Sequence, residues 1–219
     1  CYNDNQNCKK ILNEIIRNNK NFFDILIIND GSDKKFNYLL DKFKITILNL
    51  GNNYGIGFGM KLAINYALKN KYNKICRIDS DGEHNPKYIK NIFFHLNKYD
   101  FVMGIRKINY RENLLKLFSK KIIISIINIV FKLDFNDYNC GMMSMNINSM
   151  KAIKKEYFIN YPEPQIILKL CQKKMTYFKL KIIQRKRSEG TSSLNLFGGL
   201  DFFLVTLTFI LNRVLNKND

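Results

Sequence analysis

Prolines, glycines, cysteines and histidines are all scarce in this sequence of 219 residues, and each shortage excludes a class of protein. With 3 prolines and 11 glycines in a chain that is 46% hydrophobic, we expect neither a disordered chain nor a collagen-like repeat. The five cysteines are an odd number without a Cys-x-x-Cys pair, which excludes a zinc ribbon and a secreted disulfide framework and favours a reducing cytoplasm. Only two histidines, His84 and His95, are present, so a metal site built from several histidines is also excluded.

Long apolar segments are absent as well. The two longest, 122–131 and 202–211, are interrupted by polar residues and fall short of the roughly 18 residues that a membrane-spanning helix needs. The length predicts one large domain with an appendage, which we place at residues 1–195 and 196–219, the latter an amphipathic helix in a membrane interface. No signal peptide opens the sequence, and we expect the first strand of the domain to precede Cys1.

Acidic residues are outnumbered two to one, since 36 Lys and Arg face 18 Asp and Glu, for a net charge of +18. Such a surplus is typical of proteins that bind nucleic acid, an anionic membrane surface or phosphorylated substrates. A bias toward Lys, Asn and Ile throughout the chain is an alternative source of part of this charge. The basic residues are scattered and form no nucleic-acid-binding signature, so we expect no nucleic-acid partner.

Strand and helix patterns alternate in the first half of the sequence. Short apolar runs predict strands at 23–28, 45–50, 74–78 and 100–103, while apolar periodicity and an Asn-Pro helix start predict helices at 60–70 and about 86–97. This rhythm predicts an α/β fold with a mostly parallel, Rossmann-like sheet and helices on both faces. Ligands of such sheets bind at the carboxyl ends of the strands, where Asp30, Asp79, Asp81 and Arg106 all fall.

The second half has a different pattern. We expect a long helix at 113–131, a polar loop at 136–145 that leads into a short strand, and a helix at 164–173. A strand at 176–183, a basic loop at 184–194 and a final apolar or amphipathic helix at 200–215 complete the prediction.

The strongest chemical signal is Asp79-Ser80-Asp81, directly after an apolar strand. Residues two apart in an extended segment share one face, so both carboxylates can face one cation. Hard divalent ions such as Mg²⁺ or Mn²⁺ prefer carboxylate oxygens and keep positions open for substrate phosphates. The alternative is a solvated acidic turn that caps the helix starting at Pro86.

Two glycine-containing loops carry weaker signals. Asp30, at a strand end, can accept a hydrogen bond from a nucleobase N–H, and Gly31 permits a sharp turn, although Asp-Gly is also the commonest turn dipeptide. Gly55, Gly57 and Gly59 are spaced differently from the dinucleotide-binding fingerprint, so we predict a glycine turn that opens the helix at Met60.

Seven motifs, in this order, resemble those of the family-two nucleotide-sugar glycosyltransferases. The branch most similar contains dolichyl- and polyprenyl-phosphate mannosyl- and glucosyltransferases and bacterial surface-polysaccharide enzymes. The motifs are Tyr2-Asn3-Asp4, Asn29-Asp30-Gly31-Ser32, the Gly55/Gly57 loop, Asp79 to Pro86, Gly104-Ile105-Arg106, Asp137 to Gly141, and Arg187 to Ser193. The resemblance covers nearly the whole chain and implies a glycosyltransferase A fold, with inverting transfer from a UDP- or GDP-sugar.

The resemblance also implies roles for individual residues. Asn3, Asp4 and Asp30 would contact the nucleotide, and Asp79 would lie between the nucleoside and the metal. Asp81 and Glu83 would be the other metal ligands, while Arg106 and Arg187 match positions that bind phosphate groups. One departure is Cys140-Gly141-Met142-Met143, where the family usually has Ser-Gly-Phe-Arg, so a phosphate contact from that arginine is not expected here.

The acceptor determines whether a general base is needed. A sugar hydroxyl must lose a proton to a nearby carboxylate, for which Asp137 is the first candidate and Glu163 the second, whereas a lipid phosphate is already an anion. The apolar helices at 113–131 and 200–215, with lysines nearby, favour a lipid-linked acceptor and peripheral contact with the inner face of the membrane. Ordinary core packing is the alternative explanation of both helices.

Two other functions fit parts of the pattern. A sugar-phosphate nucleotidyltransferase also uses metal-binding carboxylates, but it would carry a glycine-rich loop after its first strand, and Tyr2–Asn7 is a polar turn without one. A non-catalytic basic binding module would use the positive charge but would have no need for paired carboxylates.

Overall fold

The computed structural model describes residues 1–19, 23–33, 45–106, 114–158, 162–185 and 207–208. Its helices are α1 (Asn5–Asn19), α2 (Ile56–Lys69), the 3-10 turn η1 (Pro86–Tyr88), α3 (Ile89–His95), α4 (Leu114–Phe131), α5 (Ile147–Ile153) and α6 (Pro162–Gln172). Its strands are β1 (Ile25–Asn29), β2 (Ile45–Asn49), β3 (Lys74–Arg77), β4 (Phe101–Arg106), β5 (Met143–Asn146) and β6 (Tyr177–Ile182).

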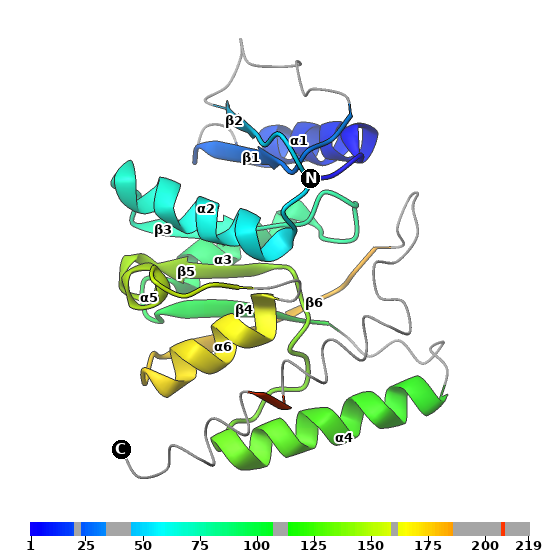
Figure 1. Cartoon of the computed structure of the whole chain (residues 1–219), viewed down its shortest axis with the longest axis vertical. Helices are drawn as coiled ribbons and strands as arrows, with labels where there is room; N and C mark the ends of the chain where they lie inside the picture. Colours follow the sequence, from blue (N-terminus) through cyan, green and yellow to red (C-terminus); the bar gives the residue numbers. More distant parts are fainter. Residues whose placement is uncertain (20–22, 34–44, 107–113, 159–161, 186–206, 209–219) are drawn as a thin grey trace.

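The described strands form two sheets. β1 and β2 pair in parallel, and the second sheet has the order β3-β5-β4-β6. In that sheet β4 and β6 are parallel, but β5 runs antiparallel to both of its neighbours, β3 and β4. The sheet is therefore mixed, where the alternating pattern predicted a mostly parallel one. The difference arises because the connection from β4 to β5 runs through α4, which lies at the lower end of the molecule and not across a sheet face (Figure 1).

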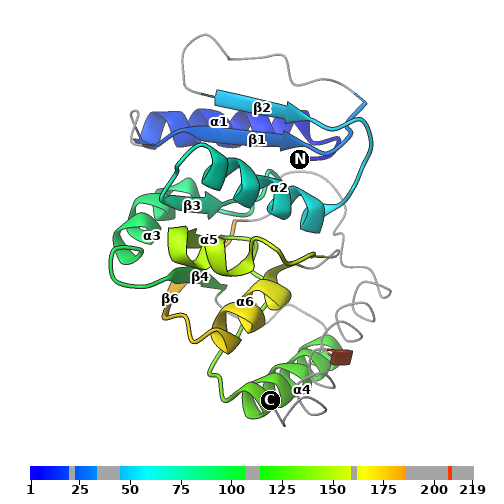
Figure 2. The same cartoon turned by 60° about the vertical axis from the view of Figure 1, so that its left-hand side comes forward.

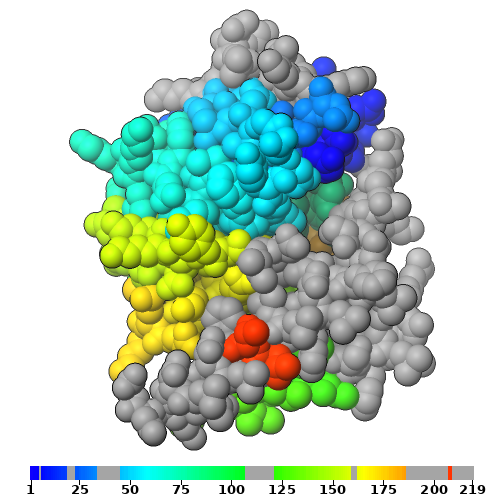
Figure 3. All heavy atoms as spheres, in the orientation of Figure 1, coloured from blue at the N-terminus to red at the C-terminus, as the bar shows by residue number. Residues whose placement is uncertain are grey.

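Helices cover both faces of the sheets, as predicted. α2, α5 and α6 pack on one another over one face, and α1 and α3 lie on the other (Figures 1 and 2). In the space-filling view the atoms of α2 lie directly above those of α5 (Figure 3). α2 contacts both β1 and β3, so it joins the two sheets and brings their carboxyl ends to one side of the molecule.

Two apolar clusters hold these layers together. The larger lies between the sheet and the α2, α5 and α6 layer and includes Ile64, Phe101, Met145 and Ile167, none of which is solvent-exposed. The smaller packs α3 against the opposite face through residues such as Ile92 and Val102. Burial of apolar side chains at this scale is the main source of stability in a domain of this size, so the strand ends are held on a rigid support.

Helix α1 corrects one prediction. Residues 2–7 were expected to form a polar turn, but the helix begins at Asn5 and continues to Asn19. Its buried residues Cys8, Ile11, Leu12 and Ile15 follow the three- and four-residue spacing of one helical face, and packing of this face stabilises the helix despite its polar first turn.

Helix α5 was not predicted from the sequence, and the remaining differences concern element boundaries. The helix predicted from Met60 begins at Ile56, because only Gly55, with φ of 87°, belongs to the turn, while Gly57 is buried within the first helical turn. The strand predicted to stop at Met103 continues to Arg106 through its parallel pairing with β6. The helix predicted at 200–215 falls outside the described residues, apart from Leu207 and Thr208.

Within the described part of the chain, no helix combines the length and the apolar character that crossing a bilayer would require.

Candidate active site

The Asp79-Ser80-Asp81 turn lies at the carboxyl end of β3, as predicted. Asp79 makes several contacts within this part of the chain. Its Oδ1 accepts hydrogen bonds from Nη2 and Nε of Arg77, at 2.8 and 3.2 Å, and its backbone N–H donates to Nδ1 of His84 at 3.3 Å. The turn therefore folds back on the strand that leads into it.

Arg77, the last residue of β3, connects two carboxylates. In addition to Asp79 it pairs with Glu163 at the start of α6, with 2.6 Å between Nη1 and Oε1. Burial by itself would lower the pKa of Arg77, but the two carboxylates outweigh this effect and raise it. For Asp79, burial works toward a higher pKa, but the charge and the hydrogen bonds of Arg77 outweigh it, so the pKa is lowered and the carboxylate is ionised at neutral pH.

Gly141 completes the enclosure of Asp79. A Cβ atom built on Gly141 would lie 1.9 Å from Oδ2 of Asp79, so only glycine allows the loop before β5 to approach this carboxylate. His84 contacts the buried Cys140 in the same loop, at 3.9 Å between Nε2 and Sγ. Burial raises the pKa of the Cys140 thiol to about 12, so this pair supplies packing and not a thiolate nucleophile.

Asp81 and Glu83 follow in the same turn and are both partly exposed. The backbone N–H of Glu83 donates to Oδ1 of Asp81 at 3.0 Å, which keeps the two residues on one short loop. The side chain of Glu83 accepts a hydrogen bond from Nε2 of Gln184 at 2.9 Å, and its carbonyl oxygen accepts one from the Arg185 N–H at 2.9 Å. The chain that leaves β6 toward the predicted phosphate-binding residue Arg187 therefore starts beside the acidic turn, whereas Arg187 lies outside the described residues.

The N-terminal motif also reaches the acidic turn. Oδ2 of Asp4 accepts a hydrogen bond from the Ser80 hydroxyl at 3.2 Å, although the two residues lie 76 positions apart in the sequence. Asn3, which has a positive φ of 47°, exchanges hydrogen bonds with Asp33 and donates its backbone N–H to the Ser32 hydroxyl, both in the turn after β1. Asp4 thus lies at the predicted site, while Asn3 braces the neighbouring turn.

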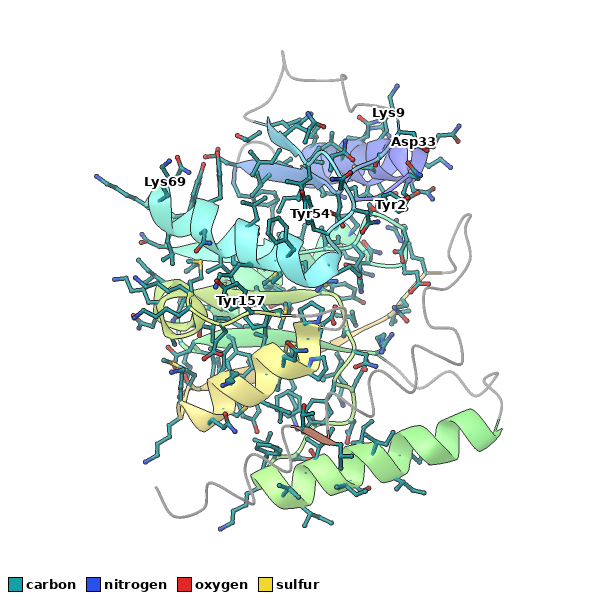
Figure 4. The ribbon with its side chains drawn as sticks, viewed as in Figure 1. Tyr2, Lys9, Asp33, Tyr54, Lys69 and Tyr157 are labelled. Atoms are coloured by element: carbon teal, nitrogen blue, oxygen red, sulfur yellow. The ribbon has the colours of Figure 1, made fainter. Side chains whose placement is uncertain are left out.

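Asp30 is buried at the carboxyl end of β1 and orders the loop before α2. Its two carboxylate oxygens accept hydrogen bonds from the N–H groups of Tyr54 and Gly55, at 2.8 and 2.9 Å. Gly31 has φ of 75° and its Cα faces the backbone of Asn52, so the predicted sharp turn is confirmed. Figure 4 shows Tyr54 beyond the carboxyl end of β1, at the end of α2 far from Lys69.

Arg106 and Asp137 form a second ion pair. Oδ2 of Asp137 lies 2.5 Å from Nε of Arg106, and Oδ1 lies 2.7 Å from Nη2, so the contact is bidentate. Only 4% of the Asp137 side chain is exposed, against 21% for Arg106. Burial would lower the pKa of Arg106, but the hydrogen bonds with Asp137 outweigh it and raise the pKa. The predicted phosphate ligand and the predicted general base are thus partners of each other.

A cavity of about 1150 Å³ lies between α1, β1, α2 and β3. Most of its wall is formed by apolar side chains, among them Ile11, Ile27 and Met60. At the carboxyl ends of β1 and β3 the lining is acidic, with Asp30, Asp79, Ser80 and Asp81, while other polar residues such as Asp24, Asn73 and Lys74 line the opposite end. A nucleoside diphosphate needs polar partners, and the acidic end is the one that holds the predicted metal-binding and nucleotide-binding residues.

The described residues contain no group of three or more His, Cys, Asp or Glu side chains that could hold a metal ion unaided. The acidic turn nevertheless has the donor chemistry of a Mg²⁺ or Mn²⁺ site, since Asp81 and Glu83 offer hard carboxylate oxygens. Ions of this kind are commonly bound by one or two carboxylates together with substrate phosphates. These two residues therefore fit a metal that the substrate helps to hold.

Arg77 was not predicted from the sequence as a site residue. A signal was present, because a single arginine stands in the otherwise apolar run from Ile75 to Ile78, two residues before Asp79 and thus on the same face of an extended chain. Its second partner, Glu163, lies 86 positions away and was not detectable from local spacing.

Comparison with known proteins gives three results. The family model for glycosyl transferase family 2 matches residues 1–161. Two uncharacterized proteins of Methanocaldococcus jannaschii are similar: MJ1222 is 29% identical over 112 residues, and MJ0544 is 26% identical over 167 residues. These matches cover 48% and 70% of this chain, and 45% and 72% of the two relatives, so the chain spans less than half the length of MJ1222.

Among solved structures, glucosyl-3-phosphoglycerate synthase from Mycobacterium tuberculosis is similar in fold. Its complex with Mn²⁺ and UDP-glucose aligns with a TM-score of 0.68 at 12% identity, over 96% of this chain and 76% of the synthase. Its complex with Mn²⁺, UDP and glucosyl-3-phosphoglycerate aligns with a TM-score of 0.66 at 9% identity, over 99% and 76% of the two chains. At these identities the similarity establishes the fold.

Proposed function

We propose that this chain, which belongs to glycosyl transferase family 2, is a glycosyltransferase. It transfers a sugar, with inversion and with a divalent cation, from a UDP- or GDP-sugar to a lipid-linked acceptor. Its fold is the predicted glycosyltransferase A fold. Family membership sets aside the two alternatives, a sugar-phosphate nucleotidyltransferase and a non-catalytic basic binding module.

The convergence of distant segments on the acidic turn carries the proposal. Asp4 from the N-terminus reaches Ser80, and Gln184, after the last described strand, reaches Glu83. Gly141, from the loop before β5, lies against Asp79. An acidic turn that only capped a helix would need none of these approaches, whereas a donor site needs groups from several strand ends.

We assign Asp81 and Glu83 as metal ligands, with Asp79 between the metal and the nucleoside. A bound Mg²⁺ or Mn²⁺ ion would neutralise charge on the departing nucleoside diphosphate. The Mn²⁺ in the complexes of the structurally similar synthase supports this choice of metal. Asp79 is oriented by Arg77, His84 and Gly141, so its position is defined before the donor binds.

The nucleotide would contact Asn3, Asp4, Asp30 and Arg187. Asp30 already accepts two backbone hydrogen bonds, and each of its carboxylate oxygens can accept a further one. It can therefore order the loop before α2 and bind a nucleobase N–H at the same time. The guanidinium of Arg187 would bind the diphosphate with its two-pronged geometry. The UDP and UDP-glucose in complexes of the similar synthase are consistent with a uridine nucleotide.

For the acceptor, the two candidate bases are held in ion pairs. Asp137 is bonded through both oxygens to Arg106, and Glu163 is bonded to Arg77. A carboxylate that neutralises an arginine is poorly placed to take a proton from a sugar hydroxyl. An acceptor that is already an anion, such as a polyprenyl phosphate, needs no base.

Helix α4 supports a membrane-associated acceptor. Ile122, Ile126 and Ile129 are 45%, 41% and 76% exposed, and their spacing of four and three residues places them on one side of the helix. Lys121 and Lys132 are exposed at either end of this stripe and can attract anionic headgroups. These features suit a helix that lies against the inner face of the cytoplasmic membrane.

The test is a transfer assay with a panel of UDP- and GDP-sugars, Mn²⁺ or EDTA, and two acceptors. One acceptor is polyprenyl phosphate in anionic vesicles, and the other is the soluble 3-phosphoglycerate. We expect Mn²⁺-dependent transfer to the lipid phosphate. Transfer to 3-phosphoglycerate alone would contradict the lipid acceptor but keep the transferase assignment, and hydrolysis or transfer that is unchanged in EDTA would contradict the metal.

A further inference from the structure

We propose that Arg77 is a positioning residue that holds Asp79 in the orientation needed for metal and nucleotide binding, and that Glu163 acts through Arg77. The inference rests on the proposed function of the acidic turn. It assigns a role to Arg77, and it gives Glu163 a role other than that of a general base.

The three side chains form a continuous chain of contacts from α6 to the acidic turn. Nη1 of Arg77 lies 2.6 Å from Oε1 of Glu163, while Nη2 and Nε both donate to a single oxygen of Asp79. All three guanidinium nitrogens therefore contact a carboxylate, Nε and Nη2 through hydrogen bonds and Nη1 through an ion pair without hydrogen-bond geometry. A lysine in place of Arg77 would present one ammonium group, which cannot occupy both ends of this arrangement at once.

Burial differs along this chain of contacts. The side chains of Arg77 and Glu163 are 14% and 9% exposed, whereas that of Asp79 is 32% exposed. The side chains of Arg77 and Glu163 are thus largely shielded from water. In such an environment a charged pair is favourable only when its geometry is good. Asp79, the outermost of the three, keeps one side open toward the acidic end of the cavity, which it lines.

The contacts around Asp79 divide between its two carboxylate oxygens, and Arg77 alone holds one of them. His84 accepts the Asp79 backbone N–H, and Gly141 leaves just enough room for Oδ2. The other oxygen, Oδ1, is held by Arg77. When Arg77 is lost, two acidic side chains, Asp79 and Glu163, remain close together without their shared cation, and we expect Asp79 to turn away from its present position.

The decisive measurement is the affinity for Mn²⁺ in the presence of UDP, determined by calorimetry without any acceptor. Supporting partners of metal sites typically contribute about 10- to 100-fold in affinity. We therefore expect Arg77→Lys to weaken Mn²⁺–UDP binding by about 10-fold or more, and Glu163→Gln to weaken it in the same direction. Because no acceptor is present, a general base would leave this affinity unchanged, which separates the two roles of Glu163.

Two controls make the outcome interpretable. Asp134→Asn removes a different ion pair, that with Lys179 on the surface, and we expect it to bind Mn²⁺–UDP like the wild type. Asp81→Asn tests the proposed metal site itself. If Arg77→Lys fails to fold, Glu163→Gln, which preserves shape, carries the test by itself.

Wild-type Mn²⁺–UDP affinity in folded Glu163→Gln and Arg77→Lys, with binding lost in Asp81→Asn, would overturn the positioning role and leave the proposed function intact. Wild-type affinity in Asp81→Asn would overturn the metal site and with it the proposed function.

Discussion

Arginine–carboxylate pairs determine which acidic side chains are available around this site. Arg77 and Arg106 each end a strand, and each is bonded to a buried or partly buried carboxylate. Within the described residues, the acidic turn thereby divides into Asp79, which is held from three sides, and the pair Asp81 and Glu83, which are tied to loop atoms. Metal binding is assigned mainly to the latter two.

The variant Asp81→Ala should abolish turnover and leave the fold intact. Removal of a partly exposed carboxylate usually changes the free energy of unfolding little, whereas loss of a metal ligand should lower kcat by orders of magnitude. Circular dichroism and a transfer assay at saturating Mn²⁺ would check both statements. A mutant that retains near-normal Mn²⁺-stimulated transfer would contradict the assignment of Asp81.

The variant Asp137→Asn distinguishes the two classes of acceptor. With a phosphate acceptor, activity per folded molecule should fall less than about 10-fold, because no base is needed. With a hydroxyl acceptor that uses Asp137 as the base, it should fall by about 10²-fold or more. The variant should also unfold more easily, since it leaves Arg106 without its buried partner, so activity must be compared at a temperature where both proteins are folded.

At the scale of helices and strands, Asp100 shows how one side chain joins three strands of the larger sheet. Asp100, directly before β4, accepts hydrogen bonds from the backbone and hydroxyl of Thr176 and from the side chain of Asn146. It thereby connects the starts of β4 and β6 with the end of β5. Burial works toward a higher pKa, but these hydrogen bonds outweigh it and lower the pKa of Asp100 below its usual value.

A pH-dependent contribution to stability follows from this shift. A carboxyl whose pKa is lower in the folded state stabilises that state above the unfolded pKa of about 3.9, and the contribution is lost as pH falls through the folded pKa. We expect Asp100→Asn to lower the free energy of unfolding by about 1 kcal/mol at pH 7. The difference from the wild type should shrink toward pH 3 in urea titrations, and a constant difference across this range would contradict the role of the charge.

The exposed apolar side of helix α4 leads to a second prediction about a single element, its binding to a membrane. Replacing Ile126 and Ile129 together by Asp should weaken binding to anionic vesicles by about 10-fold or more, because each isoleucine contributes roughly 1 kcal/mol when half of its surface is buried. Phe94→Ser on α3 is the matched control, since Phe94 is 70% exposed but lies on a different helix. Vesicle co-sedimentation measures all three proteins, and equal losses in both variants would argue against a specific membrane face.

For the whole molecule, donor and metal binding should appear as increased thermal stability. A ligand present at 100 times its Kd stabilises the folded state by about 2.7 kcal/mol, which for a protein of this size raises Tm by roughly 5–10 °C. We expect this rise with UDP and Mn²⁺ together and little change with UDP in EDTA. An equal rise in EDTA would show that the nucleotide binds without a metal.

The sequence by itself determined the fold class, the family and the position of the acidic turn. Strand-end residues such as Asp30, Asp79 and Arg106 were predictable because alternating strands and helices bring carboxyl ends to one edge. Helix α1 was also detectable, since Cys8, Ile11, Leu12 and Ile15 follow helical spacing, but its polar first turn concealed it. These features depend on neighbours within a few residues, which is the range over which a sequence pattern carries information.

Only the tertiary structure decided the direction of β5 and the partners of the charged side chains. A strand of four residues carries no signal for parallel or antiparallel pairing. The direction of β5 follows from the connection through α4, which does not cross a sheet face. The pairs Arg77–Glu163 and Arg106–Asp137 join residues 86 and 31 positions apart, at strand ends and loops that packing brings together. Whether a carboxylate serves as a base, a metal ligand or an ion-pair partner depends on such neighbours, because it is the charges and hydrogen bonds within a few ångströms that set its chemistry.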